Sequence, residues 1–283
     1  MKIPKRIAPL VDEGLVDEVV GQLKSGKEAT VYVVRCGEEI RCAKVYKLTE
    51  ERSFRQSIKY TEGRKVKNSR RARAMDKGSR FGRKEQGEAW QNAEAEALRR
   101  LARAGVRVPH PYNFLDGVLL MEMVADENGN AAPRLNDITL EPAQAREYHR
   151  TLIKEVVRML CAGIVHGDLS EYNVLASHDG PVIIDLPQAV DAAGNNSAEA
   201  MLERDVDNLT SYFGRFAPEL RTTDYGKEIW SLYKSGTLSV DIELTGCFAR
   251  IETAPDVADV MREIDDVVKE EAARKRHKAM LEN

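Results

Sequence analysis

The sequence has few of the features that mark secreted, zinc-binding or membrane proteins. Its 283 residues include only four cysteines and five histidines, and these form no CxxC pair and no other metal-ligand spacing. A disulfide framework is therefore not expected, and a reducing cytoplasm is favoured. No apolar run approaches the roughly 18 residues that cross a bilayer, and no apolar stretch of a secretory signal follows the charged N-terminus. These absences predict an intracellular protein that makes no membrane contact.

The charge distribution is uneven, although the net charge is only −3. Between residues 52 and 84, thirteen Lys and Arg stand against two acids. Two interpretations remain open for the basic loop at 64–84. One is an ordinary solvent-exposed loop, and the other is a contact for RNA or a ribosomal particle. Few aromatic side chains accompany the charges, so no platform for base stacking is evident.

The stretch GQLKSGKE, residues 21–28, resembles a Walker A loop except that Glu28 replaces the hydroxyl residue that binds Mg²⁺. The apolar spacing at 11–23 predicts a short amphipathic helix before it. A β-branched hairpin with strands at 29–35 and 40–46 follows, with its turn at 36–39. A Walker A loop must leave a strand and open a helix, so the P-loop interpretation is disfavoured. A loop over phosphates between two antiparallel strands, as in kinases, remains open.

The remaining elements indicate an α+β fold with a bilobed, protein-kinase-like architecture. A helix at 90–104 that ends at Gly105 and a buried strand at 117–124 complete a small, β-rich N-terminal lobe, residues 1–124. Helices predicted at 142–162, 201–216 and 257–281 make residues 125–283 a helical C-terminal lobe. We place the hinge between the lobes at the end of the 117–124 strand.

The most specific segment for chemistry is IVHGDLSEYNVL, residues 164–175. Asp168 and Asn173 have the spacing of a kinase catalytic loop, in which the Asp orients the attacking hydroxyl and the Asn holds metal. Asp185 follows an apolar strand and offers a hard oxygen ligand for Mg²⁺. Lys44, within the second strand, has the position of a lysine that binds the α- and β-phosphates.

Three further roles involve the glutamate partner of Lys44, His166 and Ser170. A helix glutamate should orient Lys44, and helix periodicity does not choose between Glu94 and Glu96. His166 is expected to be structural rather than a general base. Ser170 either faces the phosphates or fixes the loop through backbone hydrogen bonds.

With these residues the sequence resembles the RIO family of atypical kinases. The similar stretches, in the family's order between about residues 20 and 215, are SGKEATVY, AKVYK, the 90–105 helix with VRVPHPY, LLMEMV, VHGDLSEYN, IIDLPQAV and LERDVDNL. The absence of a winged-helix domain before them favours the plain, bacterial-type RIO branch. The resemblance implies a Mg²⁺- and ATP-dependent serine/threonine protein kinase or ATPase, with Mn²⁺ as an alternative metal.

The resemblance also implies a role for each matching residue. Ser25, Gly26 and Lys27 belong to the phosphate-covering loop, and Glu94 rather than Glu96 orients Lys44. The backbone of two hinge residues, Glu122 and Val124, holds adenine. Asp168 is the catalytic Asp, Asn173 and Asp185 hold the metal, and Asp185 transiently accepts phosphate.

The sequence departs from the plain RIO pattern in places that keep other functions open. Gly167 stands where Ala is usual, and the resulting HGDL also resembles aminoglycoside and choline phosphotransferases. Pro187 stands where Ser is frequent. Only 16 residues separate Asp185 from Leu202, too few for a full activation segment. Besides a kinase that acts on a protein or on itself, two alternatives therefore remain. One is a small-molecule phosphotransferase, and the other is a non-catalytic, ATP-gated switch that binds RNA or ribosomes.

Overall fold

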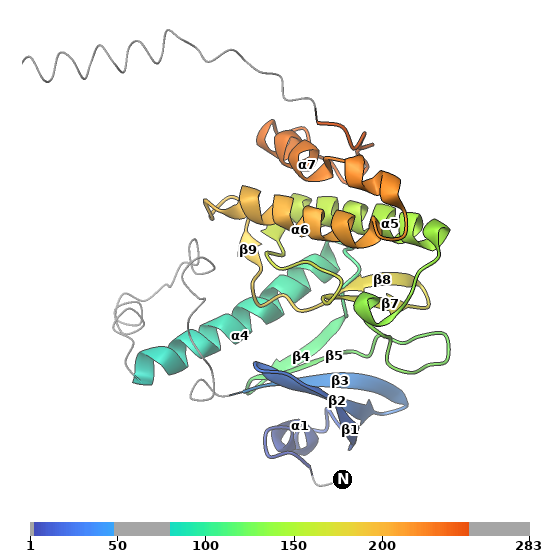
Figure 1. Cartoon of the computed structure of the whole chain (residues 1–283). Coiled ribbons are helices and arrows are strands. Elements are labelled where there is room, and N and C mark those ends of the chain that lie inside the picture. Colours follow the sequence, from blue (N-terminus) through green and yellow to red (C-terminus); the bar gives the residue numbers. More distant parts are fainter. Residues whose placement is uncertain (1–2, 48–79, 249–283) are drawn as a thin grey trace, which may run out of the picture. The chain divides into compact units, whose positions relative to one another are not determined.

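The N-terminal part of the chain forms an antiparallel sheet. The computed structural model describes residues 3–47 and 80–248, and the described residues up to Cys247 form one compact unit. The sheet has the order β1-β2-β3-β5-β4 (Figure 1). In chain order its strands are β1 (Glu18–Ser25), β2 (Ala29–Cys36), β3 (Glu39–Tyr46), β4 (Pro111–Leu115) and β5 (Val118–Glu122). The predicted hairpin at 29–46 is thereby confirmed.

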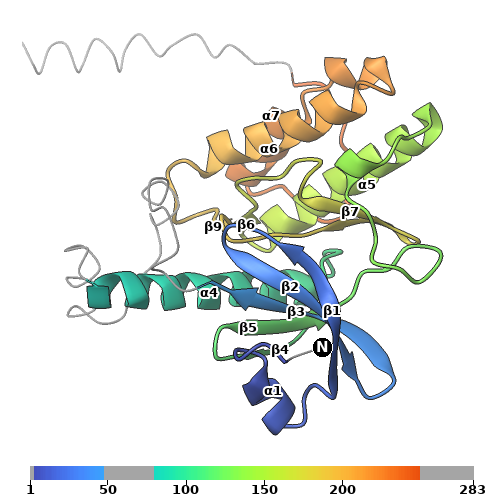
Figure 2. The ribbon, with the colours of Figure 1, turned by 60° about the horizontal axis from the view of Figure 1, so that its bottom comes forward.

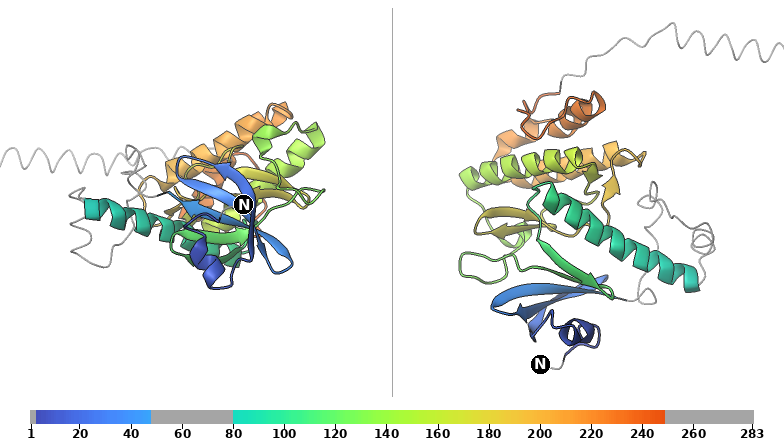
Figure 3. Two further views of the ribbon diagram at one scale, coloured as in Figure 1. Left: turned by 90° about the horizontal axis from the view of Figure 1, so that it is seen from below. Right: turned by 180° about the vertical axis from the view of Figure 1, so that it is seen from behind.

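Alternating side chains of β5 serve two different cores. Val118 and Leu120 face a small core that also contains Leu10 of helix α1 (Ala8–Asp12). Leu119, between them, faces the large core shared with the helices of the C-terminal part. This period of two is what a strand buried on both faces requires. Figure 2 shows α1 beside the sheet, and Figure 3 shows α1 and the helices α5 to α7 on opposite sides of it.

The prediction of a helix at 11–23 is wrong. Helix α1 ends at Asp12, and residues 18–25 form β1. The pairing of β1 with β2 shifts register twice, between Val19 and Gly21 and between Gln22 and Lys24. Each register shift moves the following side chains of β1 to the other face of the sheet. The apolar residues of this segment therefore have helical spacing in the sequence but do not lie on one face of the strand. Val19 is buried, whereas Leu23 is 46% exposed.

Helix α4 (Arg80–Arg103) lies between the sheet and the other helices (Figure 1). It ends two residues before Gly105, whose φ of +76° suits glycine at a helix C-terminus. The side chains of its first twelve residues lie outside the described part of the chain. The basic loop predicted at 64–84 ends earlier than expected, because residues 80–84 already belong to α4. Residues 64–79 and the helix predicted at 257–281 lie outside the described part of the chain.

Up to residue 248, where the description ends, the C-terminal part carries three α-helices and two short strand pairs. The predicted helices at 142–162 and 201–216 are confirmed as α5 and α6, whereas α7 was not predicted. The bounds are α5 (Pro142–Cys161), α6 (Ala198–Phe213), α7 (Tyr225–Lys234), β6 (Ile164–Val165), β7 (Val174–Ser177), β8 (Gly180–Ile183), β9 (Val190–Asp191), and the 3-10 turns η2 (Leu135–Asp137) and η3 (Pro218–Thr222). Strand β6 pairs with β9, and β7 pairs with β8. Within the described residues, no helix is long and apolar enough to cross a membrane.

Candidate active site

The GQLKSGKE stretch forms a hairpin turn between β1 and β2. The Gly26 N–H donates to the Ala29 carbonyl at 2.9 Å, and the Ser25 and Thr30 hydroxyls lie 3.2 Å apart. Lys27 is exposed at the tip. Because the chain leaves one strand and enters its antiparallel neighbour, the amides of this turn do not open a helix. The P-loop interpretation is therefore excluded by the element order.

Lys44 of β3 lies between two carboxylates. Its ammonium donates to Glu94 Oε1 at 2.6 Å and to Asp185 Oδ1 at 2.8 Å. The Tyr46 hydroxyl donates to Glu94 Oε2 at 2.7 Å, so both oxygens of this buried acid have partners. The Glu96 side chain, by contrast, is 66% exposed and lies 3.9 Å from Arg99 of its own helix. The structure thus brings Glu94, and not Glu96, to Lys44.

The electrostatics of this triad keep Lys44 and Asp185 charged. Burial by itself lowers the pKa of the Lys44 ammonium, but Glu94 and Asp185 raise it above its ordinary value. Burial opposes ionisation of Asp185, yet the nearby Lys44 holds the pKa of this carboxyl below its ordinary value. Asp185 also has a φ of +67°, a conformation that is unfavourable for a residue with a side chain. Its carboxylate is therefore ionised and held in a special backbone geometry.

Asp168 and Asn173 contact each other within the catalytic loop, residues 166–173. The Asn173 side-chain amide donates to the Asp168 carbonyl at 2.8 Å and lies 3.4 Å from Asp168 Oδ2. The Gln188 amide approaches the same carboxylate oxygen at 3.4 Å. Partial desolvation raises the pKa of the Asp168 carboxyl, Asp185 adds to this rise, and His166 opposes it. The residue is nevertheless exposed to solvent. Asp168 is thus an accessible carboxylate, as proton acceptance requires.

His166 links the catalytic loop to the chain that precedes Asp185. The Asp168 backbone N–H donates to His166 Nδ1 at 3.3 Å, so Nδ1 must be an acceptor. Nε2 then carries the proton and donates to the Ile184 carbonyl at 3.1 Å. The side chain is 2% exposed. With both ring nitrogens engaged by the backbone, His166 is structural rather than a general base.

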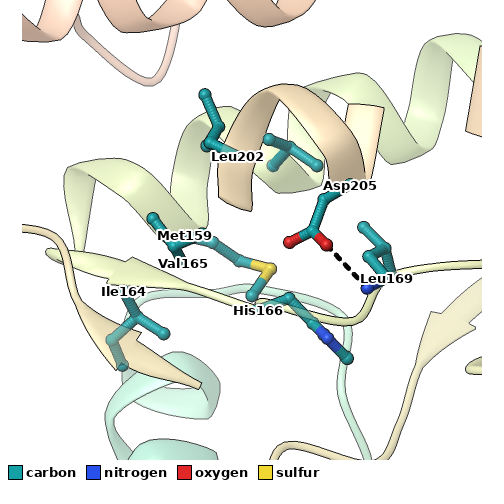
Figure 4. A pocket seen from close by; sticks show the side chains of 8 residues that line it. Met159, Ile164, Val165, His166, Leu169, Leu202 and Asp205 are labelled. Atoms are coloured by element: carbon teal, nitrogen blue, oxygen red, sulfur yellow. Dashed lines mark hydrogen bonds between the residues drawn. The ribbon is translucent and has the colours of Figure 1, made fainter. Parts of the chain in front are cut away.

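Side chains of α6 form hydrogen bonds with the backbone of the catalytic loop. The sequence analysis gave these residues no role. The buried Asp205 carboxylate accepts the Gly167 N–H at 2.7 Å. It also accepts the Leu169 N–H at 2.9 Å, the bond drawn in Figure 4. Arg204 donates to the Gly167 carbonyl, and Asn208 donates to the Leu169 carbonyl at 3.0 Å. Four main-chain groups that flank Asp168 are thus bonded to one helix.

The sequence carried a signal for Asp205. In LERDVDNL this acid falls among Leu202, Val206 and Leu209, on the apolar face of the helix. A charged residue on such a face is buried with partners or serves a site. Burial raises the pKa of Asp205 to about 6, while His166 and the two backbone N–H groups lower it. A cavity of about 10 Å³ lies between this acid, His166 and the neighbouring apolar side chains, and Figure 4 shows the side chains that line it.

The hinge residues and Ser170 complete the predicted set. The Glu122 N–H donates to the His110 carbonyl at 2.8 Å, and the Val124 carbonyl accepts the Ala132 N–H at 2.9 Å. Within the described residues the Val124 N–H makes no hydrogen bond. The Ser170 carbonyl accepts the Asn173 N–H at 2.9 Å, while the Ser170 hydroxyl has no partner among the described residues. Ser170 thus fixes the loop through its backbone and leaves its hydroxyl available.

The fold and this arrangement define a protein-kinase-like phosphotransferase. An antiparallel sheet with a lysine–glutamate pair faces a loop with Asp and Asn five residues apart, and Asp185 reaches the lysine from the next loop. Comparison with known proteins makes the class more specific. Residues 30–226 match the family model for the RIO domain.

Several kinases with curated names are similar to this chain. The RIO-type serine/threonine-protein kinase Rio1 of Haloferax volcanii is 38% identical over 213 residues, which cover 74% of this chain and 68% of that protein. Rio1 of Methanocaldococcus jannaschii is 32% identical over 75% of this chain and 68% of its own length. The human serine/threonine-protein kinase RIO1 is 30% identical over 75% of this chain but only 36% of its own length. The chain belongs to the RIO family and is an ATP-dependent RIO-type kinase.

Proposed function

We propose that Asp168 and Lys44 carry the phosphotransfer reaction. The acceptor oxygen attacks the γ-phosphorus of ATP, its proton passes to Asp168 Oδ, and the bond from phosphorus to the β–γ bridging oxygen breaks to release ADP. Lys44, oriented by Glu94, binds the phosphates. The observation that carries this proposal is the contact of Lys44 with both Glu94 and Asp185, at 2.6 and 2.8 Å.

Asn173 and Asp185 would hold the divalent metal that kinase chemistry uses. Their donor atoms fit Mg²⁺, with Mn²⁺ as the alternative, because both offer hard oxygens. The Asn173 amide nitrogen is engaged by the Asp168 carbonyl, which leaves Oδ1 for the ion, and Lys44 keeps Asp185 ionised. When bound, the metal neutralises charge on the phosphates.

ATP would lie under the β1–β2 turn, between lobes that we divide at residue 124. Ser25, Gly26 and Lys27 would cover the phosphates, and the Val124 N–H, which has no partner within the described residues, would bind adenine together with the Glu122 backbone. The Ser170 hydroxyl would face the phosphates.

The acceptor that we propose is a Ser or Thr hydroxyl, on another protein or on this chain. The names of the relatives support a protein acceptor. Transient transfer to Asp185, with turnover as an ATPase, is the second route, and the contact of this carboxylate with Lys44 supports it. A cytoplasmic location and contact with ribosome precursors through the basic loop remain predictions from the sequence.

Transfer of radiolabelled γ-phosphate from ATP tests the reaction. An acid-stable phosphoester on protein supports Ser or Thr transfer, and a hydroxylamine-labile product supports the acyl phosphate on Asp185. Lys44→Met should abolish both products. Rapid labelling of an aminoglycoside or choline-like alcohol without protein labelling would instead establish a small-molecule phosphotransferase. Full complementation in cells by Asp168→Ala would favour the non-catalytic switch.

Contact with RNA is tested separately. Neutralising Arg70, Arg71 and Arg73 should lower RNA affinity and flatten its dependence on salt, since fewer counterions would be released. Unchanged affinity at every salt concentration would leave only the solvent-exposed loop.

A further inference from the structure

Glu122, the last residue of β5, is hydrogen-bonded to Arg107, which lies in the segment between α4 and β4. The Arg107 guanidinium donates to Glu122 Oε1 at 2.8 Å and to Oε2 at 2.9 Å. Such a bidentate pair fixes orientation as well as distance, which a single charge contact does not. The pair is partly buried, with 35% and 27% of the two side chains exposed. Glu122 is one of the two residues proposed to hold adenine.

The main chain of Arg107 is anchored in the part of the molecule that carries the chemistry. Its N–H donates to Glu155 Oε2 of α5 at 3.0 Å, and Glu155 is 4% exposed. Its carbonyl accepts the Ile183 N–H at 3.0 Å. Ile183 ends β8, two residues before Asp185. One residue thus connects the hinge strand to both α5 and the strand that leads to Asp185.

The backbone of His110 also binds Glu122. The His110 N–H donates to Glu122 Oε2 at 3.0 Å, and the Glu122 N–H donates to the His110 carbonyl. Although burial opposes its ionisation, Arg107 and His110 hold the pKa of Glu122 below its ordinary value. The carboxylate is therefore charged, and three hydrogen bonds fix its position.

We infer that Arg107 is a positioning residue for the nucleotide base. Its anchored backbone and its bidentate hold on Glu122 set where the hinge lies relative to Asp185 and the catalytic loop. Removing the side chain frees the end of β5 while the contacts that hold phosphate and metal stay in place. The inference rests on the proposed adenine site at Glu122 and Val124.

The test uses the full chain and two probes, a non-hydrolysable ATP analogue and Mg²⁺-tripolyphosphate, with binding measured by calorimetry. Arg107→Met should weaken binding of the analogue about tenfold, as expected for loss of hydrogen bonds to a charged group, and leave tripolyphosphate binding unchanged. Arg107→Lys keeps the positive charge but loses the bidentate hydrogen bonds of the guanidinium. Its affinity for the analogue should lie between those of the parent and Arg107→Met. Adding Glu122→Gln to Arg107→Met should change the affinity less than about twofold, because the pair acts as a unit.

Arg99→Met is the matched control. The Arg99 side chain is also 35% exposed and also faces a glutamate, but both residues belong to α4. This variant should bind both probes as the parent does. Parent-like affinity of Arg107→Met for the analogue, or an equal loss of both probes, would overturn the inference. If Arg107→Met unfolds at the assay temperature, the ratio of the two affinities in Arg107→Lys decides. A parent protein that does not bind the analogue would instead refute the adenine site.

Discussion

The catalytic loop and the nucleotide loop are held in opposite ways. Around Asp168, four main-chain groups are hydrogen-bonded to side chains of α6, and the central carboxylate, Asp205, is 2% exposed. The turn at 25–28 is exposed and is closed by the Gly26–Ala29 backbone bond, a hydroxyl contact from Ser25, and the bond from the Lys47 N–H to the Glu28 carbonyl.

This difference matches what each loop must do. Proton transfer and metal binding need side chains whose supports do not move during the reaction. A loop that covers phosphates must let nucleotide enter and leave, so it is drawn from the less stable parts of a fold. We therefore expect loss of the Asp168 carboxylate to affect chemistry alone, loss of the support from α6 to affect stability as well, and substitutions in the turn to affect neither strongly.

The largest expected effect is on turnover. Asp168→Ala should lower kcat by about 10²- to 10⁴-fold, since it removes the proposed proton acceptor. The melting temperature should stay close to that of the parent, because α6 holds the loop through its backbone and not through the Asp168 carboxylate. Steady-state phosphotransfer and a thermal melt measure the two quantities. Asp179→Ala, at an acid whose side chain is 68% exposed, is the control. If Asp168→Ala keeps the kcat of the parent, Asp168 is not the proton acceptor.

The second effect is on stability. Asp205→Ala should lower the free energy of unfolding by about 2–5 kcal/mol, because it leaves the Gly167 and Leu169 N–H groups buried without an acceptor. Turnover should fall as well, although Asp205 does not reach the site. Urea unfolding gives the stability change. A stable variant with lost activity would show that Asp205 acts on chemistry directly, and a stable, active one would mean that α6 does not support the loop.

The same contrast explains how much of the molecule could be predicted. The hairpin, α5, α6 and the spacing of Asp168, Asn173 and Asp185 follow from local pattern, and they were predicted. The choice between Glu94 and Glu96 needed the family resemblance, because both lie on one helix and only contact with Lys44 distinguishes them. Helix periodicity failed at 11–23 because register shifts in an edge strand imitate it. The support from Asp205 is a contact between α6 and a distant loop, so only its place on an apolar face signalled it.

The third effect concerns acid stability at the contact between α5 and α6. His149 of α5 is 2% exposed, its Nε2 lies 3.2 Å from the Thr210 hydroxyl of α6, and burial lowers its pKa to about 4. Between this value and the ordinary pKa of about 6.5, the unfolded chain binds a proton that the folded chain does not. The His149 contribution to stability is therefore lost as pH falls from 6.5 to 4, by about 3 kcal/mol.

Asp205 acts with the opposite sign, since its raised pKa means that the folded state binds the extra proton and stability falls as pH rises toward 6. The measured quantity is therefore the difference between His149→Gln and the parent. In urea unfolding from pH 7 to pH 4, the variant should lose less stability than the parent. His178→Gln, at a side chain that is 51% exposed, should follow the parent curve. Parallel curves for His149→Gln and the parent would mean that His149 does not titrate in this range.

The smallest expected effect is in the nucleotide turn. Lys27 is exposed and makes no hydrogen bond within the described residues, so Lys27→Ala should change the free energy of unfolding by less than about 0.5 kcal/mol. A single solvent-screened contact with phosphate should raise KM for ATP only about two- to fivefold and leave kcat unchanged. Lys24→Ala, at an exposed lysine within β1, should change neither parameter. A fall in kcat as large as that of Asp168→Ala would mean that the turn takes part in the chemical step, and the division between a fixed catalytic loop and a movable nucleotide loop would then fail.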